Sequence, residues 1–381
     1  MTDIKTIWKG EIISKVWFMK LSRNIALSTI FLGLFGIVMI YSASSYSAKL
    51  DFNDEFFYVK KQAIAFVAGV AVMFAGAKLN LEYLNKFKWV ILIFSIVILG
   101  LVFIPGLGVE SYGATRWLNL GFTTVQPSEF AKFGLMIFLA GYLYENPPKK
   151  FINLIVPLIC GLGVCVLIML EPNMSITMCV GLGLLIMLYI AGTSKKWFVI
   201  LFLCVLVAVP LMIFLEPYRV KRFTAFINPW QNPQAEGYQL IQSYYALGGG
   251  GLFGVGLFRS QQKYLFLPFA ESDSIFSVIG EELGLFGCLF VMAVFAVLIF
   301  SGIRVALRSK SFYHTLLATG LTGIMGLQTL INMAVVTGAI PPTGLPLPYI
   351  SAGGTALMTY MFVSGILINI ASPKPKSNHT M

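Results

Sequence analysis

The stretch IALSTIFLGLFGIVMI, residues 25–40, decides the fold class of this chain. It carries no charged residue, and it follows a mixed, basic segment, residues 1–23, that does not have the pattern of a cleaved signal peptide. A helix needs about 20 mostly apolar residues to cross the hydrocarbon core of a bilayer. We therefore interpret this stretch as the core of an uncleaved first membrane-spanning helix.

Similar apolar runs recur along the rest of the chain. They are continuous rather than alternating, which favours helices over the strands of a membrane barrel. The sequence thus predicts an all-α, polytopic membrane protein of about ten transmembrane helices. The predicted spans are residues 25–43, 62–78, 89–104, 128–144, 151–170, 173–191, 197–215, 275–303, 313–336 and 349–371.

The composition leads to the same class. Of the 381 residues, 57% are hydrophobic and only 11% are charged, whereas a soluble domain carries about 25% charged residues. The net charge of +11 would by itself be compatible with binding to nucleic acid. Because Lys and Arg collect in the cytoplasmic loops of membrane proteins, we predict contacts with membrane lipids and no nucleic-acid partner. The five cysteines lack metal-ligand spacing, so no metal site is predicted from them.

Basic residues set the predicted orientation. With a cytoplasmic N-terminus, every inside segment contributes Lys or Arg, and together these segments hold 17 of the 27 basic residues. The predicted organisation is a cytoplasmic tail (1–24), one membrane domain (25–371) and a second cytoplasmic tail (372–381). Outer loops follow at about 105–127 and at 216–274, and the second is long enough to be functional. The inside basic residues are Lys5, Lys9, Lys15, Lys20, Arg23, Lys78, Lys86, Lys88, Lys149, Lys150, Lys195, Lys196, Arg304, Arg308, Lys310, Lys374 and Lys376.

Asp273 lies where the long outer loop meets the next predicted span. A carboxylate at that depth is costly unless it is paired or used, so catalysis is one interpretation. The other is helix capping, since Asp or Ser before an apolar run accepts hydrogen bonds from the first free amides of the helix. The residue pattern alone leaves both interpretations open.

Other charged residues lie within predicted spans. Glu129 and Lys132, spaced i and i+3, share one helix face. They either neutralise each other structurally or line a polar cavity. Glu281 and Glu282 lie near the second turn of the span 275–303, where one suits a cavity and the other suits pairing with a basic group.

A basic cluster opens the long outer loop, against the positive-inside trend. It consists of Arg219, Lys221 and Arg222. The cluster either contacts lipid headgroups or binds the diphosphate of a lipid-linked substrate, for which a planar guanidinium is well suited. Arg116 in the other outer loop is a second candidate. The Pro- and Gly-rich stretch 341–354 predicts a turn or re-entrant segment before the last span.

Several motifs together resemble the SEDS family of cell-wall glycosyltransferases, which comprises RodA, FtsW and SpoVE. The resemblance extends from about residue 113 to the last span, and the stretch 248–263 is most similar to the FtsW/SpoVE branch. The motifs that carry it are Gly113-Ala114-Thr115-Arg116-Trp117, Gln126-Pro127-Ser128-Glu129, Asn228-Pro229-Trp230, Gly237-Tyr238-Gln239, Gln242-Ser243, Ser260 to Asp273, Gly280-Glu281-Glu282-Leu283-Gly284, Thr343-Gly344-Leu345-Pro346-Leu347-Pro348 and Ser351-Ala352-Gly353-Gly354.

This resemblance implies a peptidoglycan glycosyltransferase. Family members polymerise lipid II, an undecaprenyl-diphosphate-linked precursor, usually beside a class B penicillin-binding protein. The implied place is the outer face of the cytoplasmic membrane, in the divisome at the septum or in a related cell-wall complex. Asp273 would be the general base of an inverting transfer. No fixed cofactor is implied, and a divalent cation is left open. The candidate substrate-binding residues are Arg116, Glu129, Lys132, Arg219, Arg222, Lys263 and Glu281.

The chain also departs from the family's pattern. Phe269 and Glu271 stand where the family often has Glu and His, Asn173 stands in place of Asp, and Thr115 in place of Arg. Any family role of these positions is therefore not carried over. Two rival functions remain at this stage, a lipid II flippase or other transporter, and a non-catalytic scaffold that recruits a transpeptidase.

Overall fold

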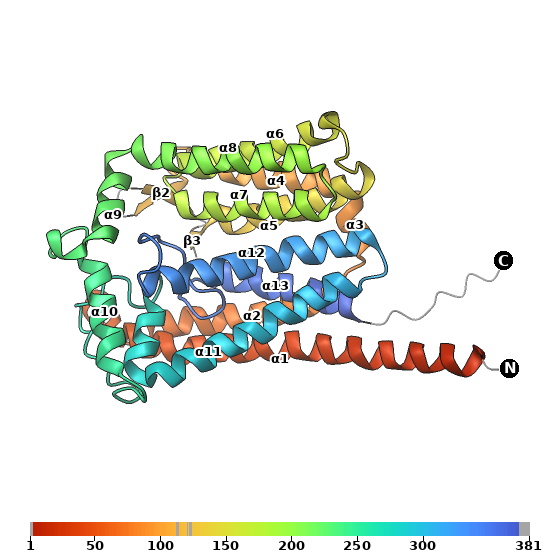
Figure 1. The fold of residues 1–381 in the computed structure, drawn as a ribbon. Coiled ribbons are helices and arrows are strands. Elements are labelled where there is room, and N and C mark those ends of the chain that lie inside the picture. Colours follow the sequence, from red (N-terminus) through yellow and green to blue (C-terminus); the bar gives the residue numbers. More distant parts are fainter. Residues whose placement is uncertain (1–2, 112–113, 120, 122–123, 373–381) are drawn as a thin grey trace.

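The computed structural model of this chain describes residues 3–111, 114–119, 121 and 124–372, and it is a bundle of long helices (Figure 1). Each of the ten predicted spans coincides with one helix of the bundle. These helices are α1 (Asp3–Phe52), α2 (Phe57–Lys78), α4 (Lys88–Leu101), α5 (Pro127–Glu145), α6 (Phe151–Leu170), α7 (Met174–Ile190), α8 (Lys195–Phe214), α11 (Ile275–Arg308), α12 (Phe312–Val336) and α13 (Gly354–Ala371).

Seven of the helices within the described residues are long and apolar enough to cross a membrane. The remaining three are α4 and α7, which are shorter apolar helices, and α5, which carries Glu129 and Lys132 in its first turns. The all-α, multi-pass membrane fold predicted from the sequence is confirmed. The first helix is longer than predicted: α1 starts at Asp3, because no proline interrupts it, so the expected tail 1–24 is not separated from it by a break. The C-terminal tail from residue 373 lies outside the described residues.

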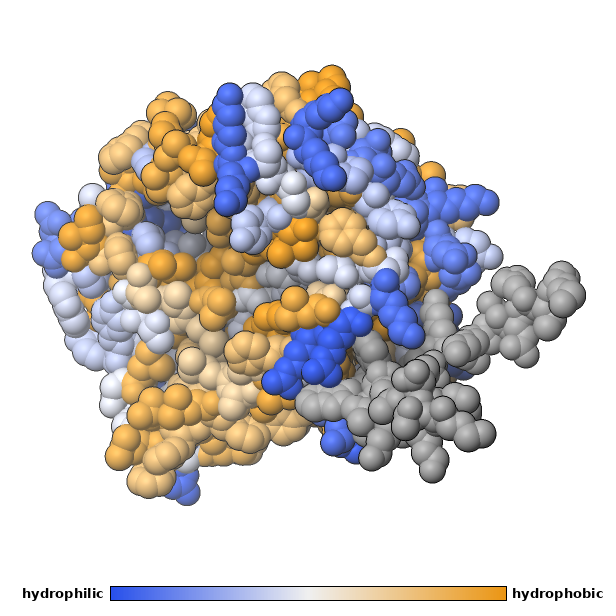
Figure 2. Space-filling model, turned by 45° about the vertical axis from the view of Figure 1, so that its right-hand side comes forward, coloured by the Kyte–Doolittle hydropathy of each residue, from blue (hydrophilic) through white to orange (hydrophobic). Residues whose placement is uncertain are grey.

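The two ends of the bundle differ in character. Both chain ends lie at one end, together with the short helix α3 (Leu81–Lys86), as Figure 1 shows. Hydrophobic residues cover much of the sides, while hydrophilic residues gather toward this end (Figure 2). The two predicted outer loops lie together at the opposite end. This arrangement matches the predicted topology, in which both loops share one face and both termini share the other.

The outer segments contain regular structure of their own. Between α4 and α5, strands β1 (Gly108–Ser111), β2 (Ala114–Asn119) and β3 (Thr124–Val125) form an antiparallel sheet in the order β1-β2-β3. Gly108 pairs with Leu118, and Leu118 also pairs with Val125. The long loop 216–274 folds into α9 (Pro217–Ile227), the short 3-10 helix η1 (Pro229–Gln231) and α10 (Tyr238–Gly250).

Glycines allow the closest helix contacts. A Cβ atom on Gly365 of α13 would lie 2.1 Å from the carbonyl oxygen of Met73 in α2, and one on Gly76 would lie 2.8 Å from that of Phe362. Small residues let helix backbones approach in membranes, where apolar burial alone drives little association. The helix α8 is the opposite case, because none of its residues is buried. It therefore stands at the edge of the bundle, where one side of a cavity forms.

The helix α11 is interrupted at Gly284, which has φ of 67° and ψ of −167°. The carbonyls of residues 281–282 accept hydrogen bonds from the amides of residues 255–256, both at 3.0 Å. The amides of residues 285–286 donate to the carbonyls of residues 251–252, at 2.9 and 3.2 Å. The loop after α10 thus satisfies the backbone groups that the interruption frees. This pairing fixes the first turns of α11, which follow Asp273, against the long outer loop.

The Pro-rich segment, residues 341–353, enters the bundle without forming a helix. A Cβ on Gly36 of α1 would lie 2.7 Å from the Cα of Ile350, so α1 and the segment touch backbone to backbone. On its other side, Gln62 of α2 donates to the carbonyl of Ser351 at 3.2 Å and accepts from the amide of Gly353 at 3.1 Å. Irregular backbone of this kind persists inside a membrane protein only where protein partners satisfy it.

Candidate functional site

A cavity of about 980 Å³ opens at the end of the bundle that carries the outer segments. Its walls come from β2, the turn between α6 and α7, α8, α9, the loop before α11 and the Pro-rich segment. A volume of this size suits a small-molecule or lipid-linked ligand. The polar and charged residues in its lining include Arg116, Gln126, Asn173, Glu216, Tyr218, Arg219, Arg222, Ser272, Asp273, Thr343 and Thr355.

Asp273 faces this cavity and does not cap the helix that follows it. The N-cap of α11 is Ser274, whose side chain makes no capping hydrogen bond and instead donates to the carbonyl of Pro268 at 3.0 Å. The capping interpretation of Asp273 is therefore wrong. The helix begins one residue later, and the carboxylate is left free to point into the cavity.

Burial raises the pKa of Asp273 to about 6, because the surrounding protein stabilises the ionised carboxylate less well than water does. The nearby guanidinium groups of Arg222 and Arg116 oppose this shift, and the carboxylate of Glu271 adds to it. A carboxylate with a pKa near 6 is ionised at neutral pH and is basic enough to take a proton from a substrate hydroxyl. The position of Asp273 thus makes its carboxylate more basic than an ordinary solvated one.

Three arginines share the cavity with Asp273. Arg116 of β2 donates from Nε to the carbonyl of Glu171 at 3.0 Å and from a terminal nitrogen to that of Pro172 at 2.7 Å. Arg219 of α9 donates to the carbonyl of Met212 at 2.8 Å. The fold thus brings together cations that lie about 100 residues apart in the sequence.

Arg222, one turn after Arg219 on α9, is held by a ring and a carbonyl. Its guanidinium lies 4.7 Å from the centre of the Tyr218 ring, and it donates to the carbonyl of Pro342 at 3.5 Å. Lys221 points elsewhere and pairs with Glu236 at 3.8 Å on the surface. Guanidinium groups provide forked donors for phosphate oxygens. The cavity therefore combines a basic carboxylate with sites for an anionic group.

Glu171 is a buried acid beside this site that the sequence analysis did not select. It has 0% exposure, and neither carboxyl oxygen has a hydrogen-bond partner within the described residues. Burial raises its pKa to about 8, with Arg116 opposing the shift. The carboxyl group is therefore neutral at pH 7. Its position between two predicted spans, directly before Pro172, is the sequence signal that could have marked it.

Glu129 and Lys132 do not line the cavity. Both side chains have 0% exposure, and their charged atoms lie 2.7 Å apart. The ammonium group of Lys132 also donates to Gln328 at 2.6 Å and to the hydroxyl of Tyr360 at 3.0 Å. The structure thus supports the structural alternative for this pair, in which it joins α5 to α12 and α13. These two residues lie outside the cavity that holds Asp273, and their assignment to substrate binding stays a prediction.

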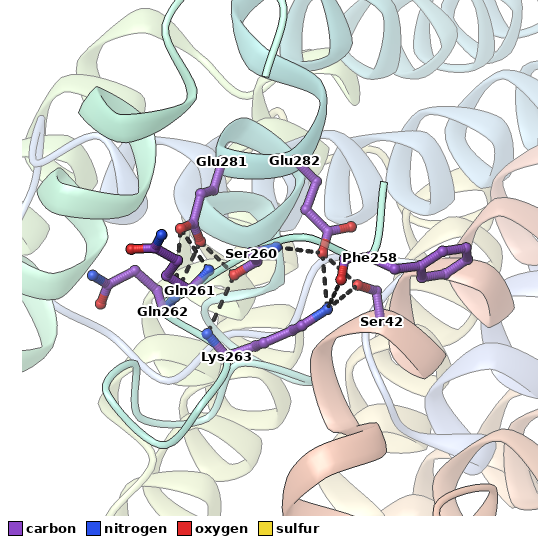
Figure 3. A network of polar contacts seen from close by, with 8 residues as sticks. All are labelled: Ser42, Phe258, Ser260, Gln261, Gln262, Lys263, Glu281 and Glu282. Atoms are coloured by element: carbon purple, nitrogen blue, oxygen red, sulfur yellow. Dashed lines mark hydrogen bonds and ion pairs between the residues drawn. The ribbon is translucent and has the colours of Figure 1, made fainter. Parts of the chain in front are cut away.

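Lys263 and Glu281 also lie away from the cavity, in a network that holds the outer loop (Figure 3). Glu281 accepts from the hydroxyl of Ser260 and from the backbone amide of Gln261, the latter at 2.8 Å. Lys263 donates to the carbonyl of Phe258 at 2.6 Å. The two residues hold the loop that leads toward Asp273, and their assignment to substrate binding stays a prediction.

Glu282 joins the same network, formed by Lys263, Glu281 and the outer loop, to α1. It lies 3.3 Å from the ammonium group of Lys263, and Ser42 of α1 donates to the same carboxylate (Figure 3). With 5% and 0% exposure, the side chains of Lys263 and Glu282 form a buried ion pair. The expectation that one of the two glutamates pairs with a basic group is confirmed, and Glu282 is the one. The expectation that the other faces a cavity is wrong, because Glu281 binds the loop.

Comparison with known proteins gives the family. The model of the cell cycle protein family that comprises FtsW, RodA and SpoVE matches residues 22–376. This chain belongs to that family. It is 39% identical to the probable peptidoglycan glycosyltransferase FtsW of Geobacter sulfurreducens, with 91% of this chain and 94% of the relative covered. It is 37% identical to stage V sporulation protein E of Bacillus subtilis, with 90% and 94% covered.

Solved structures of the family have the same fold. A chain from a peptidoglycan synthase complex that coordinates polymerization and crosslinking is 26% identical, with a TM-score of 0.74 over 90% of this chain and 96% of that chain. The rod shape determining protein RodA of Thermus thermophilus is 23% identical, with a TM-score of 0.67 over 91% and 95% of the two chains. The second similarity concerns the fold alone.

Asn173 and Phe269, two of the positions where this chain departs from the family's motifs, make hydrogen bonds that shape the cavity wall. Asn173 lines the cavity and caps α7, accepting from the amide of Ile176 at 3.3 Å. Phe269 has a φ of 53°, and its carbonyl accepts from the amides of Ser272 and Ser274 at 3.0 and 3.2 Å. This turn directs Asp273 into the cavity. Glu271 is half-buried and lies outside the lining.

Proposed function

We propose that this protein is a peptidoglycan glycosyltransferase that polymerises lipid II by inverting transfer, with Asp273 as the general base. The observation that carries the proposal is one cavity in which Asp273 lies together with Arg116, Arg219 and Arg222. This combination suits a substrate with a sugar hydroxyl at one end and a diphosphate at the other. Membership of a family with probable peptidoglycan glycosyltransferases supports the same conclusion.

The proposed reaction is a single displacement. Asp273 takes the proton of the acceptor's sugar 4-hydroxyl, because that hydroxyl is too weak a nucleophile while protonated. The oxygen then attacks the anomeric carbon of the donor, and the bond from that carbon to the diphosphate oxygen breaks. Attack opposite the leaving group converts an α-linked donor into a β-linked polymer, as in inverting glycosidases. The departing lipid diphosphate needs no proton from an acid.

The arginines stabilise the charge that develops on the diphosphate. Fixed cationic donors aimed at such charge contribute strongly in a site from which water is partly excluded. Within the described residues, no group of three or more His, Cys, Asp or Glu side chains is placed to hold a metal ion. In this proposal guanidinium groups supply counter-charge to the diphosphate, and whether a divalent cation also binds there is left open.

The proposed setting is the cytoplasmic membrane, with the cavity on its outer face. There the enzyme would work beside a class B penicillin-binding protein, in the divisome or a related cell-wall complex. The solved relative within a peptidoglycan synthase complex supports such a partner. The outer loops at one end of the bundle and the termini at the other support this orientation.

Polymerisation of lipid II by the purified protein, with and without its partner, tests the proposal. Wild type is expected to form long glycan strands, and Asp273→Asn is expected to lose about 10²–10⁴-fold in rate, the usual effect of a general base. Asparagine keeps the size of the side chain, so folding is expected to be intact. If the protein moves lipid II across vesicle membranes without polymerising it, the flippase hypothesis is favoured. If it shows neither polymerisation nor transport, the scaffold hypothesis is favoured. Full activity of Asp273→Asn would refute the assigned base.

A further inference from the structure

The loop that carries Asp273 is held at three consecutive carbonyls. Those of residues 271–273 accept, in order, from the backbone amide of Ala352 at 2.9 Å, the hydroxyl of Ser351 at 2.6 Å and the side-chain amide of Asn332 at 3.0 Å. Two donors belong to the Pro-rich segment, and the third belongs to α12. A loop held at every carbonyl has little freedom to move its side chains.

Asn332 connects this loop to the Pro-rich segment. Its amide nitrogen donates a second hydrogen bond, to the carbonyl of Leu345 at 2.7 Å, and the residue is only 1% exposed. One turn earlier on α12, Gln328 donates to the carbonyl of Pro346 at 3.0 Å. Both hydrogen bonds are donated by the same side-chain amide nitrogen of Asn332. Asn332 therefore connects the backbone of Asp273 directly to that of Leu345.

The residues directly before Leu345 form the cavity wall beside Asp273. A Cβ atom on Gly344 would lie 3.1 Å from the Oδ2 atom of Asp273, so the carboxylate lies beside a residue without a side chain. Thr343 also lines the cavity, and its hydroxyl is buried without a hydrogen-bond partner among the described residues. A buried hydroxyl without a partner is costly unless a ligand or water satisfies it.

We propose that Asn332 is a positioning residue that holds Asp273 against the cavity wall formed by Thr343 and Gly344, and that the acceptor sugar binds in the cavity in front of this wall. The inference rests on the proposed function and assigns its acceptor subsite. Gly344 places no side chain beside the carboxylate, and the hydroxyl group of Thr343 is available to hydrogen-bond a hydroxyl group of the sugar. Asp273 then meets the reacting hydroxyl at a distance that α12 determines.

The first test removes the positioning amide. In Asn332→Ala the carbonyls of Asp273 and Leu345 lose their shared donor, and a displacement of about 1 Å at the reacting group costs about 10²-fold in rate. We expect kcat for lipid II polymerisation to fall by about that factor. The acid limb of the pH profile should move to lower pH, because a loosened loop admits water to the carboxylate. Binding of lipid II, which the arginines dominate, should change less than about threefold.

The matched control is Thr329→Val on the same helix. Thr329 is 2% exposed, and its hydroxyl donates only to the carbonyl of Met325, one turn earlier. This variant should keep the wild-type kcat and pH profile. A second variant, Gly344→Ala, would place a methyl group 3.1 Å from the Oδ2 atom of Asp273, where it crowds the carboxylate and the adjoining part of the cavity, so it should lower kcat at least about tenfold in protein that still folds.

The outcomes separate this inference from the proposed function. Wild-type kcat and an unmoved acid limb in folded Asn332→Ala would overturn the positioning role, and full activity of Gly344→Ala would overturn the subsite. If Asn332→Ala does not fold, Asn332→Leu, which keeps the size of the side chain and lacks both donors, takes its place with the same expected result. If Asn332→Ala or Gly344→Ala behaves like wild type while Asp273→Asn is inactive, this inference fails but the assignment of Asp273 as general base stands. If Asp273→Asn is active, the proposed function itself is refuted.

Discussion

The acid limb of the pH–rate profile should report Asp273. Its pKa is raised from 3.8 to about 6, chiefly by burial, while Arg222 and Arg116 lower it and Glu271 raises it further. A general base works only when ionised, so polymerisation should increase as the pH rises through about 6. The measurement is lipid II polymerisation by the purified protein from pH 4.5 to pH 8, at fixed ionic strength and at substrate well below KM, so that the rate reports kcat/KM and the free enzyme.

The expected magnitude follows from the ionised fraction. With a pKa of about 6, roughly 9% of Asp273 is ionised at pH 5 and roughly 91% at pH 7, so the rate should differ about tenfold. With the ordinary pKa of about 3.9, the rates would differ by less than about a tenth. Arg222→Gln removes the larger attraction that lowers the pKa, so its acid limb should move to higher pH. A flat profile between pH 5 and 7 would refute the burial argument.

The same shift has a consequence for stability. The folded-state pKa of Asp273 lies above its unfolded value, so the favourable contribution of the protonated form is complete below about pH 4 and is lost as the pH rises through about 6. At pH 7 the ionised carboxylate therefore costs up to about 3 kcal/mol. Asp273→Asn should unfold at a higher temperature than wild type at pH 7 and lose this advantage near pH 4. A less stable asparagine variant at pH 7 would contradict the reasoning.

Three further predictions concern the rest of the site. Lys263→Met should destabilise the protein by about 3 kcal/mol by leaving Glu282 unpaired, and adding Glu282→Gln should restore most of that loss in thermal unfolding. Arg116→Ala should weaken lipid II binding about tenfold, and Arg116→Lys should not restore it because a forked donor is lost; normal binding by both would make Arg116 a structural residue only. A cysteine at exposed Gln234 should react with a membrane-impermeant reagent in intact cells, whereas protection would reverse the proposed orientation.

The sequence by itself determined the fold class and the surface on which chemistry is expected. Apolar runs of membrane-spanning length are local features, and a chain in a bilayer must satisfy its backbone within each helix. The ten runs therefore locate the ten helices. The charge distribution between loops predicts which segments share a face, and Figure 1 places the outer segments together. Asp273 and the arginines could be selected because charges at span ends are costly without a task.

Only the tertiary structure decided which of these charges share a cavity. Glu129 with Lys132 and Lys263 with Glu282 look like Asp273 in sequence, since all are charged residues at or near a span. Whether such a charge meets a partner or an open space depends on residues far away in the chain. Gln328 and Tyr360 bind Lys132, and Ser42 and Glu282 bind Lys263, whereas Asp273 lines the cavity with Gly344 beside its carboxylate. These contacts join residues up to 228 positions apart, a separation that local patterns cannot encode.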